Sequence, residues 1–364
     1  MKGLKSICTI ASVYIGTVIG AGFASGQEIL QFFGKHGKSG VLGIGFSTLI
    51  LVVVAVRTLE TVYRKKIRSF EDYGRRYFHK KVFNGFNLLV AFLLLVGYFV
   101  MLAGSGAVIK ENFQIPAIYG ILIMSVFCFS VFTFGIDGVA KANNIVVPFL
   151  LGVVFFVSLS VLIKNKLLFS NLHGKSFVAL KGINTLKLEG GLIDFFLLNL
   201  GWVKSSLLYA AHNSIGAIIV ITSLLPYIHN AKAAKWGGVL GGLGLGFVAL
   251  LILLSLLLLY TDIVGLEVPM VAIAHSLSET HKKIYSVVLL LAMFTTAIAN
   301  GYGCILRFSY IMKLREGWAR ILVCCLSIPL ATLGFKNLVS FFYPLFGYVG
   351  FLFIGVFVLK TNNN

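Results

Sequence analysis

Long apolar runs, separated by short polar segments, recur from one end of the chain to the other. Runs of about 20 apolar residues have the length that a helix needs to cross roughly 30 Å of hydrocarbon. Ten such spans can be placed, at about 6–33, 40–57, 83–109, 116–134, 144–163, 203–228, 237–260, 284–307, 319–335 and 337–359. The pattern predicts an all-α membrane protein with about ten transmembrane helices.

Composition agrees with a protein that lies in the lipid bilayer. Of the 364 residues, 58% are hydrophobic and 12% are charged, whereas a soluble domain carries about 25% charged residues. The formal net charge of +19 comes from basic residues that separate the spans, so it does not form the basic patch that nucleic-acid binding requires. No linker divides the chain, and residues 1–364 are predicted to form a single transmembrane domain.

The distribution of basic residues predicts the orientation. Segment 57–81 holds nine Lys and Arg residues against three acidic ones, so the positive-inside rule places it in the cytoplasm. Both termini then also lie in the cytoplasm. The long loop 164–202 falls outside, and its segment 190–201, too short to span, is expected to be an interfacial helix. Five cysteines lie in apolar runs without paired spacing and are expected to be packing residues: Cys8, Cys128, Cys304, Cys324 and Cys325.

The first span contains residues that weaken a helix, followed by a charge. Its segment YIGTVIGAGFASGQE, residues 14–28, ends on Glu28 and contains four glycines: Gly16, Gly20, Gly22 and Gly26. Glu28 is the one acidic residue of twelve that falls inside a span by this assignment. An ionisable group in a span is by default a candidate for function. The alternative is that Glu28 lies near the outer interface and caps a helix.

The sixth span repeats this anomaly. Its segment LLYAAHNSIGAIIV, residues 207–220, places His212, Asn213 and Ser214 before Gly216. Polar side chains and a glycine at this depth predict an interruption, which is tolerated only where it lines a cavity or is buried in protein. Close packing between helices would explain the glycines equally well.

The positions of the two anomalies favour a transporter. They fall in the first and sixth spans of ten, which are corresponding members of two halves of five, about 6–163 and 203–359. An odd number of spans per half forces the halves into opposite orientations. This is the inverted-repeat pattern of transporters, in which broken helices form the substrate site near the membrane midplane. The glycines would free backbone N–H groups for an anion and C=O groups for a cation.

The sequence YIGTVIGAGFASGQEILQFF closely resembles the first helix of the YkvI-type bacterial membrane proteins. Through them the chain is similar to the amino acid–polyamine–organocation superfamily, whose fold is that of the bacterial leucine transporter. The resemblance implies a multi-pass protein of the bacterial cytoplasmic (inner) membrane. Its motif G-x-x-x-G-x-G matches GTVIGAG and implies that the N–H groups of Ala21 and Gly22, beside Gly20, receive a substrate carboxylate.

A second part of the resemblance concerns sodium. The segment LLLAMFTTAIA, residues 289–299, resembles the A-x-x-T-S sodium signature of the leucine transporter. The resemblance implies a site made by the carbonyls of Gly16, Ile19 and Ala292 and the hydroxyls of Thr295 and Thr296. From the residues alone, adjacent threonines could equally bond back to the preceding helical turn.

The chain also departs from that family. The side chains of a second sodium site would fall at Phe23 and Ala210, and the gate arginine at Gly26, so both features are expected to be absent. Tyr209 matches the aromatic lid over the substrate, and His212 replaces a small hydroxyl residue beside it. Together with Asn213 and Ser214 they complete the expected substrate contacts. Tyr98 is a candidate second gate residue, although an isolated Tyr in an apolar span commonly serves packing.

These features predict a secondary active transporter of an amino acid or similar small organic solute, working by alternating access. The expected coupling ion is Na⁺ at one site, with no other cofactor. One alternative is proton coupling through Glu28 or His212. Another is a ligand sensor on the same scaffold, like the germinant-receptor subunits of the superfamily. No nucleophile or acid–base pair suggests an enzyme.

A last motif predicts packing rather than chemistry. The segment GGVLGGLGLG, residues 237–246, spaces Gly238, Gly242 and Gly246 four residues apart. This spacing is typical of a close-packing face between membrane helices.

Overall fold

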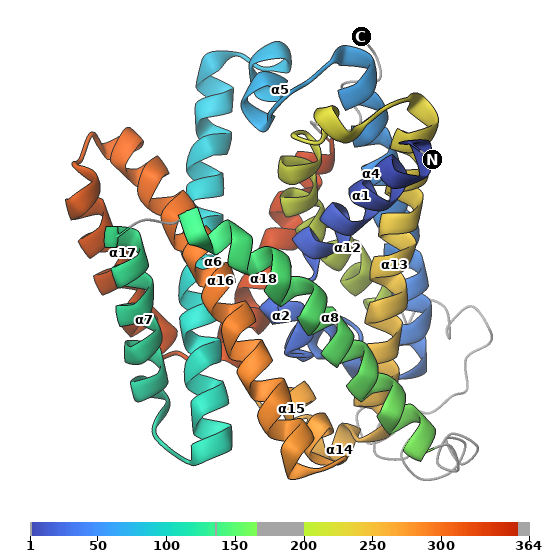
Figure 1. Ribbon diagram of the computed structural model, residues 1–364, viewed down its shortest axis with the longest axis vertical. Helices are drawn as coiled ribbons and strands as arrows, with labels where there is room; N and C mark the ends of the chain where they lie inside the picture. The colour runs from blue at the N-terminus through green and yellow to red at the C-terminus, as the bar shows by residue number, and fades with distance from the viewer. Residues whose placement is uncertain (1, 135–136, 166–199, 356–364) are drawn as a thin grey trace.

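The structure, a computed structural model, describes residues 2–134, 137–165 and 200–355, which are almost entirely helical (Figure 1). Of the predicted interfacial helix at 190–201, residues 190–199 therefore lie outside the described residues. The first part of the chain forms α1 (Lys2–Val18), α2 (Ala21–Ala24), α3 (Gln27–Phe32), η1 (Gly34–His36), α4 (Lys38–Lys65), α5 (Phe70–Tyr77), α6 (Lys80–Phe113), α7 (Ala117–Phe134) and α8 (Asp137–Lys164). The second part forms α12 (Gly201–Ile221), η2 (Leu225–Tyr227), α13 (Ala231–Leu258), α14 (Tyr260–Ile263), α15 (Pro269–His275), α16 (Glu279–Met312), α17 (Glu316–Ala331) and α18 (Phe335–Ile354).

Helices long and apolar enough to cross a membrane are present in both parts of the chain. Among the described residues six meet that criterion: α4, α6, α8 from Ile145 onward, α13, α16 and α18. Shorter apolar helices cover 3–18 and 117–133. The multi-pass membrane architecture agrees with the sequence, while the count of ten spans stays a prediction.

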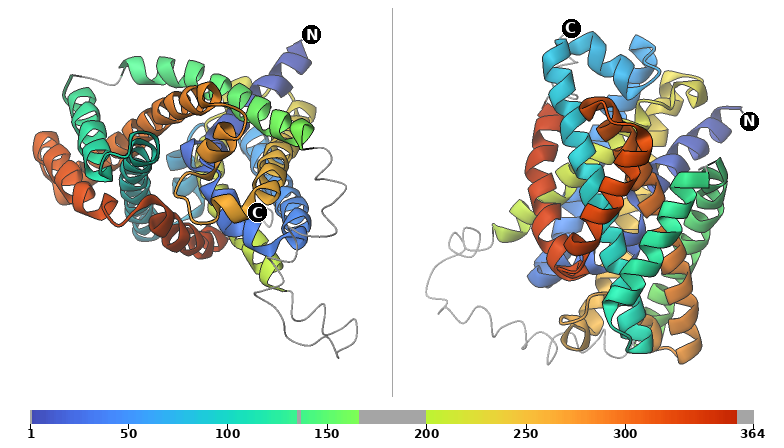
Figure 2. Two further views of the ribbon diagram at one scale, coloured as in Figure 1. Left: turned by 90° about the horizontal axis from the view of Figure 1, so that it is seen from below. Right: turned by 90° about the vertical axis from the view of Figure 1, so that its left-hand side faces the viewer.

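The two ends of the molecule are built differently (Figures 1 and 2). One end carries α5, and α1 begins and α18 ends toward it; we call it the α5 end. The other carries α14 and α15 between α13 and α16, and we call it the hairpin end.

The helix α5 lies within the basic segment 57–81. The Ser69 hydroxyl caps it by accepting the N–H of Asp72. The Asp72 carboxylate accepts bonds from the Arg68 N–H at 3.0 Å and from Arg76 at 2.9 Å. These bonds hold the pKa of Asp72 below its ordinary value. The segment predicted to be a cytoplasmic loop thus contains a short helix, which some of its charges stabilise.

At the hairpin end, carboxylates accept backbone N–H groups from other elements. The Glu111 side chain, at the end of α6, accepts from Glu267 at 2.8 Å and from Val268 at 3.3 Å. The Glu267 side chain in turn accepts from Phe335 at 2.7 Å, at the start of α18. These hydrogen bonds join the hairpin to α6 and α18.

The predicted glycine face of α13 is confirmed. If each of the three glycines carried a Cβ atom, that atom would collide with α4. It would lie 3.0 Å from Val56 at Gly238 and 2.5 Å from Val52 at Gly242, and at Gly246 it would meet Thr48. A second row of glycines on α13 lies against α1, with Gly237 on Ile10, Gly241 on Tyr14 and Gly244 on Ile15. The absence of side chains lets both helices approach α13 closely.

Candidate functional site

The first apolar segment is interrupted within its glycine-rich stretch. Helix α1 ends at Val18, Gly20 is extended (φ −102°, ψ −171°), and α2 begins at Ala21. The N–H of Gly20 bonds to the carbonyl of Val18, and not to the carbonyl four residues earlier. Among the described residues, no hydrogen bond reaches the carbonyls of Gly16 and Ile19 or the N–H groups of Ala21 and Gly22. The structure thus leaves unpaired the backbone groups that the sequence singled out.

A second interruption lies between α2 and α3, and carbonyl groups on its N-terminal side have partners from other elements. Gly26 adopts φ +80°, which favours glycine. The carbonyl of Ser25 accepts the N–H of Met270 from the hairpin, and the carbonyl of Ala24 accepts the Tyr285 hydroxyl at 2.6 Å. A Cβ at Gly26 would lie 2.7 Å from Met270. The structure therefore has no room at Gly26 for the arginine that this position would carry in the leucine transporter.

Glu28 lies in the interior. Its side chain is 4% exposed, and one carboxylate oxygen accepts a bond from the Asn213 amide at 3.0 Å. The alternative interpretation of Glu28 as an interfacial cap is therefore wrong, because the side chain bonds to α12 and makes no capping bond. Within the described part of the chain, the ion pairs belong to other carboxylates, namely Asp72, Glu279 and Glu316.

The predicted interruption at residues 212–216 is not present, since α12 runs without a break from Gly201 to Ile221. The physical reason is visible in the side chains. The Asn213 amide and the Ser214 hydroxyl donate to the carbonyls of Tyr209 and Ala210, one turn earlier, at 3.1 and 2.7 Å. Such bonds satisfy polar side chains without opening the helix. The sixth span therefore supplies side chains to the centre of the protein, and its backbone stays paired.

One residue near the interruption was not singled out by the sequence, namely Tyr343 of α18. Its hydroxyl lies 2.7 Å from the position that a Cβ on Gly22 would occupy, and the Glu28 carboxylate lies 3.7 Å from the same point. The His212 ring stacks on the Tyr343 ring with centroids 4.5 Å apart. Nδ1 of His212 has no hydrogen-bond partner among the described residues. Gly22, Glu28 and Tyr343 therefore converge on one point.

All of these side chains lie in the interior: Glu28, Asn213 and Tyr343 expose 4%, 9% and 8% of their surface. We call the group of Gly22, Glu28, Asn213, His212 and Tyr343 the central cluster.

The two tyrosines predicted from the sequence lie in different places. Tyr209 packs against Phe32 and Phe33, with ring centroids 5.5 and 4.8 Å apart, close to the central cluster in α3 and α12. Tyr98 packs instead on Phe132 of α7, and its hydroxyl is 3.5 Å from the Cys324 sulfur of α17. None of its described contacts is with the central cluster, which fits the packing interpretation of Tyr98.

The oxygens expected to bind sodium lie on both sides of the first interruption. Thr296 of α16 points toward it, because its hydroxyl is 3.9 Å from where a Cβ on Gly20 would lie. The Thr295 hydroxyl donates to the carbonyl of Ala292 at 3.1 Å. Within the described ranges no group of three His, Cys, Asp or Glu residues could hold a metal ion. A cation here would depend on carbonyl and hydroxyl oxygens.

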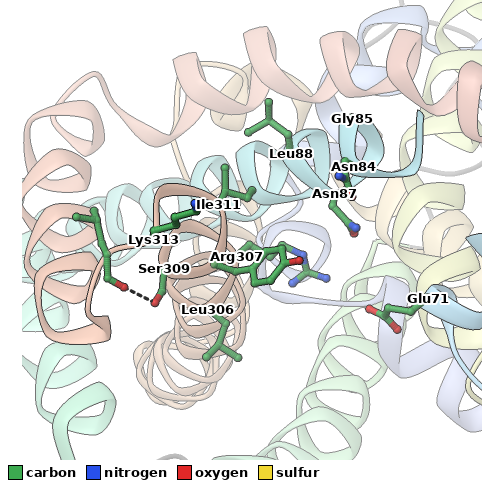
Figure 3. A pocket seen from close by; sticks show the side chains of 12 residues that line it. Glu71, Asn84, Gly85, Asn87, Leu88, Leu306, Arg307, Ser309, Ile311 and Lys313 are labelled. Atoms are coloured by element: carbon green, nitrogen blue, oxygen red, sulfur yellow. Dashed lines mark hydrogen bonds between the residues drawn. The ribbon is translucent and has the colours of Figure 1, made fainter. Parts of the chain in front are cut away.

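A large cavity opens at the α5 end (Figure 3). Its volume is about 1110 Å³, and α5, α6 and α16 line it. The polar side chains among its lining residues are Glu71, Asn84, Asn87, Arg307, Ser309, Tyr310 and Lys313. Sequence reasoning had no signal for this cavity, because its residues look like ordinary span ends.

Comparison with known proteins gives the fold and two relatives. No family model matches the chain. It is 28% identical to the uncharacterized membrane protein YkvI of Bacillus subtilis over 355 residues, which are 98% of this chain and 96% of that protein. It is 23% identical to the uncharacterized protein YyaD of the same species, over 92% of this chain and 90% of YyaD.

Three solved structures have a similar architecture. The manganese transporter of Eremococcus coleocola aligns with a TM-score of 0.63 and 14% identity over 98% of this chain and 78% of that one. MhsT in complex with L-phenylalanine aligns with a TM-score of 0.62 and 15% identity, over 95% of this chain and 88% of MhsT. The inward-facing conformation of Mhp1 aligns with a TM-score of 0.51 and 12% identity, over 94% of this chain and 72% of Mhp1. The chain therefore resembles YkvI over nearly its whole length and has the leucine-transporter fold, whose representatives here are transporters and not enzymes.

Proposed function

We propose that this protein is a secondary transporter that moves an amino acid or a similar small organic solute across the membrane. One observation carries the proposal: the first helix is interrupted beside a buried carboxylate, in a fold shared with transporters. The solute would bind at the central cluster, with a carboxylate group near the N–H groups of Ala21 and Gly22. Those N–H groups have no partner among the described residues, which supports this assignment.

We further propose that one sodium ion drives the cycle. Its ligands would be the carbonyls of Gly16, Ile19 and Ala292 and the hydroxyls of Thr295 and Thr296. The unpaired carbonyls of Gly16 and Ile19 support this, as does the approach of Thr296 to Gly20. A hydroxyl that donates its proton to a carbonyl keeps lone pairs for a cation, so the bond of Thr295 is compatible with the site.

We propose that the protein works by alternating access; the different construction of its two ends, with a cavity at the α5 end and bonds that join the hairpin to α6 and α18 at the other, supports this. The positive-inside rule assigns the α5 end to the cytoplasm, together with both termini. The cavity lined by α5, α6 and α16 would then face the cytoplasmic side of a bacterial cytoplasmic membrane.

Proton coupling through Glu28 is the second candidate, and it too rests on a specific observation. Glu28 is buried and has no basic partner among the described residues. A carboxyl group in such a place is well suited to carry a proton across the membrane.

Uptake by proteoliposomes tests these proposals. We expect a labelled amino acid in a screened panel to accumulate when an inward sodium gradient is imposed, and not when potassium replaces sodium. Uptake driven by a proton gradient without sodium would favour the second candidate. Binding without uptake of any solute would contradict transport and favour a sensor. Vesicles that contain Gly22→Leu serve as the control, because the new side chain would fill the space in front of Tyr343.

A further inference from the structure

We propose that the cavity at the α5 end binds the headgroup of an anionic phospholipid, with Arg307 and Lys313 holding its phosphate group. This inference goes beyond the proposed function and does not depend on it, because a lipid site at this end would serve a transporter and a sensor alike.

The cavity lies apart from the central cluster. Its described lining residues belong to α5, α6, α16 and the turn after α16, and none of them comes from α2, α3, α12 or α18, which hold the central cluster. The positive-inside rule places this end at the cytoplasmic leaflet, whose anionic lipids carry negative charge. Pockets for small ligands have volumes of about 300–1,000 Å³, so a cavity of about 1110 Å³ has room for a headgroup.

The direction of the Arg307 side chain is the first reason. An arginine at the end of a span ordinarily extends its side chain outward to water. The Arg307 guanidinium instead turns back along α16, where Nη1 donates to the carbonyl of Gly303 at 3.2 Å, one turn closer to the hairpin end. Gly303 is a point of close approach between α16 and α6, since an added Cβ would lie 3.1 Å from Leu94 of α6. The charge is therefore drawn toward the membrane interior, beside the contact between these helices.

The unbalanced charge of the cavity is the second reason. Among the described residues no carboxylate forms an ion pair with Arg307 or Lys313. Glu71 is the one acidic residue among those that line the cavity, and Figure 3 shows it at the opposite end from Ser309 and Lys313. The bond to α16 uses Nη1 of Arg307 and leaves the rest of the planar guanidinium for a ligand. A guanidinium matches two oxygens of a phosphate, which would also supply the missing negative charge.

The apolar side chains of the cavity are the third reason, and they favour a lipid over a free phosphate ion. Leu88 of α6 and Leu306 and Ile311 of α16 line the cavity and are exposed. A soluble anion gains nothing from such side chains, whereas a phospholipid can lay its acyl chains against them while its phosphate meets the cations. Tyr310, also in the lining, is 85% exposed, and tyrosine favours the level of the headgroups.

The experiment measures lipid binding by the full-length protein in detergent. The purified protein is stripped of lipid, and its thermal unfolding is followed as phosphatidylglycerol, phosphatidylcholine or inorganic phosphate is added at equal ionic strength. Phosphatidylcholine has the same phosphate and acyl chains but no net charge, and inorganic phosphate has no acyl chains. We expect phosphatidylglycerol alone to raise the unfolding temperature in a saturable manner.

Substitutions locate the effect. In Arg307→Gln we expect the affinity for phosphatidylglycerol to fall about tenfold, the size expected for a charge-assisted hydrogen bond. In Lys313→Gln we expect about a threefold loss, the effect of one exposed charge. The matched control is Arg64→Gln, which removes an exposed arginine of α4 that does not line the cavity and should bind as the parent does. If Arg307→Gln does not fold, the comparison of Lys313→Gln with Arg64→Gln still tests the site.

The possible outcomes separate the explanations. Equal stabilisation by phosphatidylglycerol and phosphatidylcholine would overturn the inference, and so would unchanged affinity in Arg307→Gln. Equal stabilisation by inorganic phosphate would assign the cavity to a soluble anion and overturn the lipid site. A loss in Arg64→Gln as large as that in Arg307→Gln would mean that the net charge of this end attracts lipid without a site. Failure of solute uptake would refute transport alone, because lipid binding is measured without a solute.

Discussion

Replacement of Gly347 by alanine should separate two helices at the centre of the protein. Gly347 of α18 packs directly on the backbone of α12: an added Cβ would lie 2.6 Å from the carbonyl oxygen of Leu208 and 2.9 Å from its Cα. No side-chain rotation relieves a contact with backbone. Ordinary contact begins at 3.4 Å, so the helices must part locally by about 0.8 Å. Overpacking of this kind costs about 1–3 kcal/mol of stability.

The same shift should reach the central cluster. Gly347 lies one helical turn after Tyr343, and Leu208 directly precedes Tyr209. Moving α18 away from α12 therefore moves the Tyr343 ring away from the His212 ring, on which it stacks. Misplacement by about 1 Å can reduce the efficiency of a site up to about 100-fold. We expect Gly347→Ala to lower both the unfolding temperature and the affinity for solute.

Thermal unfolding in detergent and solute binding measure the two effects. The matched control is Gly216→Ala on α12, where an added Cβ meets nothing within 4 Å. Because alanine favours helix over glycine by about 1 kcal/mol, this control should be as stable as the parent or more so. If Gly347→Ala unfolds at the parent temperature and binds normally, the tight packing of α18 on α12 does not exist as described.

Three further predictions follow from individual contacts. Gly22→Leu should abolish solute binding, because a Cβ there already lies 2.7 Å from the Tyr343 hydroxyl, and wild-type affinity would mean that Gly22 serves packing only. Thr296→Ala should raise the sodium concentration for half-maximal uptake, and an unchanged sodium titration would remove Thr296 from the site. Asp72→Asn should speed hydrogen exchange in α5 at pH 7. The lowered pKa of Asp72 means that its stabilisation is fully present at neutral pH and is lost progressively as the pH falls from about 4 through the lowered pKa, so the variant and the parent should converge only at more acidic pH.

Glycine spacing was the most informative signal in the sequence. The row Gly238, Gly242 and Gly246 predicted a close-packing face on one side of a helix, because four-residue spacing keeps the glycines together; the structure shows that α4 packs on this face. The glycines of the first span likewise indicated where α1 would end. Both inferences depend only on local backbone properties, which a sequence records directly.

The rest of the central cluster depends on contacts between distant segments. Asn213 and Ser214 could either interrupt a helix or form hydrogen bonds within it. For Asn213, the outcome also involves Glu28, which lies 185 positions away in the sequence and accepts a bond from its amide. Tyr343 lies in the segment FFYPLFGYVGF, where one aromatic residue looks like the next. Only the packing of α18 on α12 distinguishes it from Phe342, so sequence alone could not select it.

The two glycine rows of α13 have different mechanical consequences for their neighbours. Toward α4, an added Cβ would lie 3.0 Å from a backbone atom of Val56 at Gly238 and 3.1 Å from backbone atoms of Val52 at Gly242. Backbone thus packs on backbone here, and no change of rotamer can alter this contact, so α4 and α13 are expected to move together. Toward α1, the atoms nearest to the added Cβ positions belong to the side chains of Ile10, Tyr14 and Ile15. Because the outer atoms of these side chains can change rotamer, we expect α1 to change its tilt against α13 more readily than α4 does. Such a movement would have to keep or break the bond from the Tyr14 hydroxyl to the carbonyl of Leu51 in α4, which makes that bond the point about which α1 would turn.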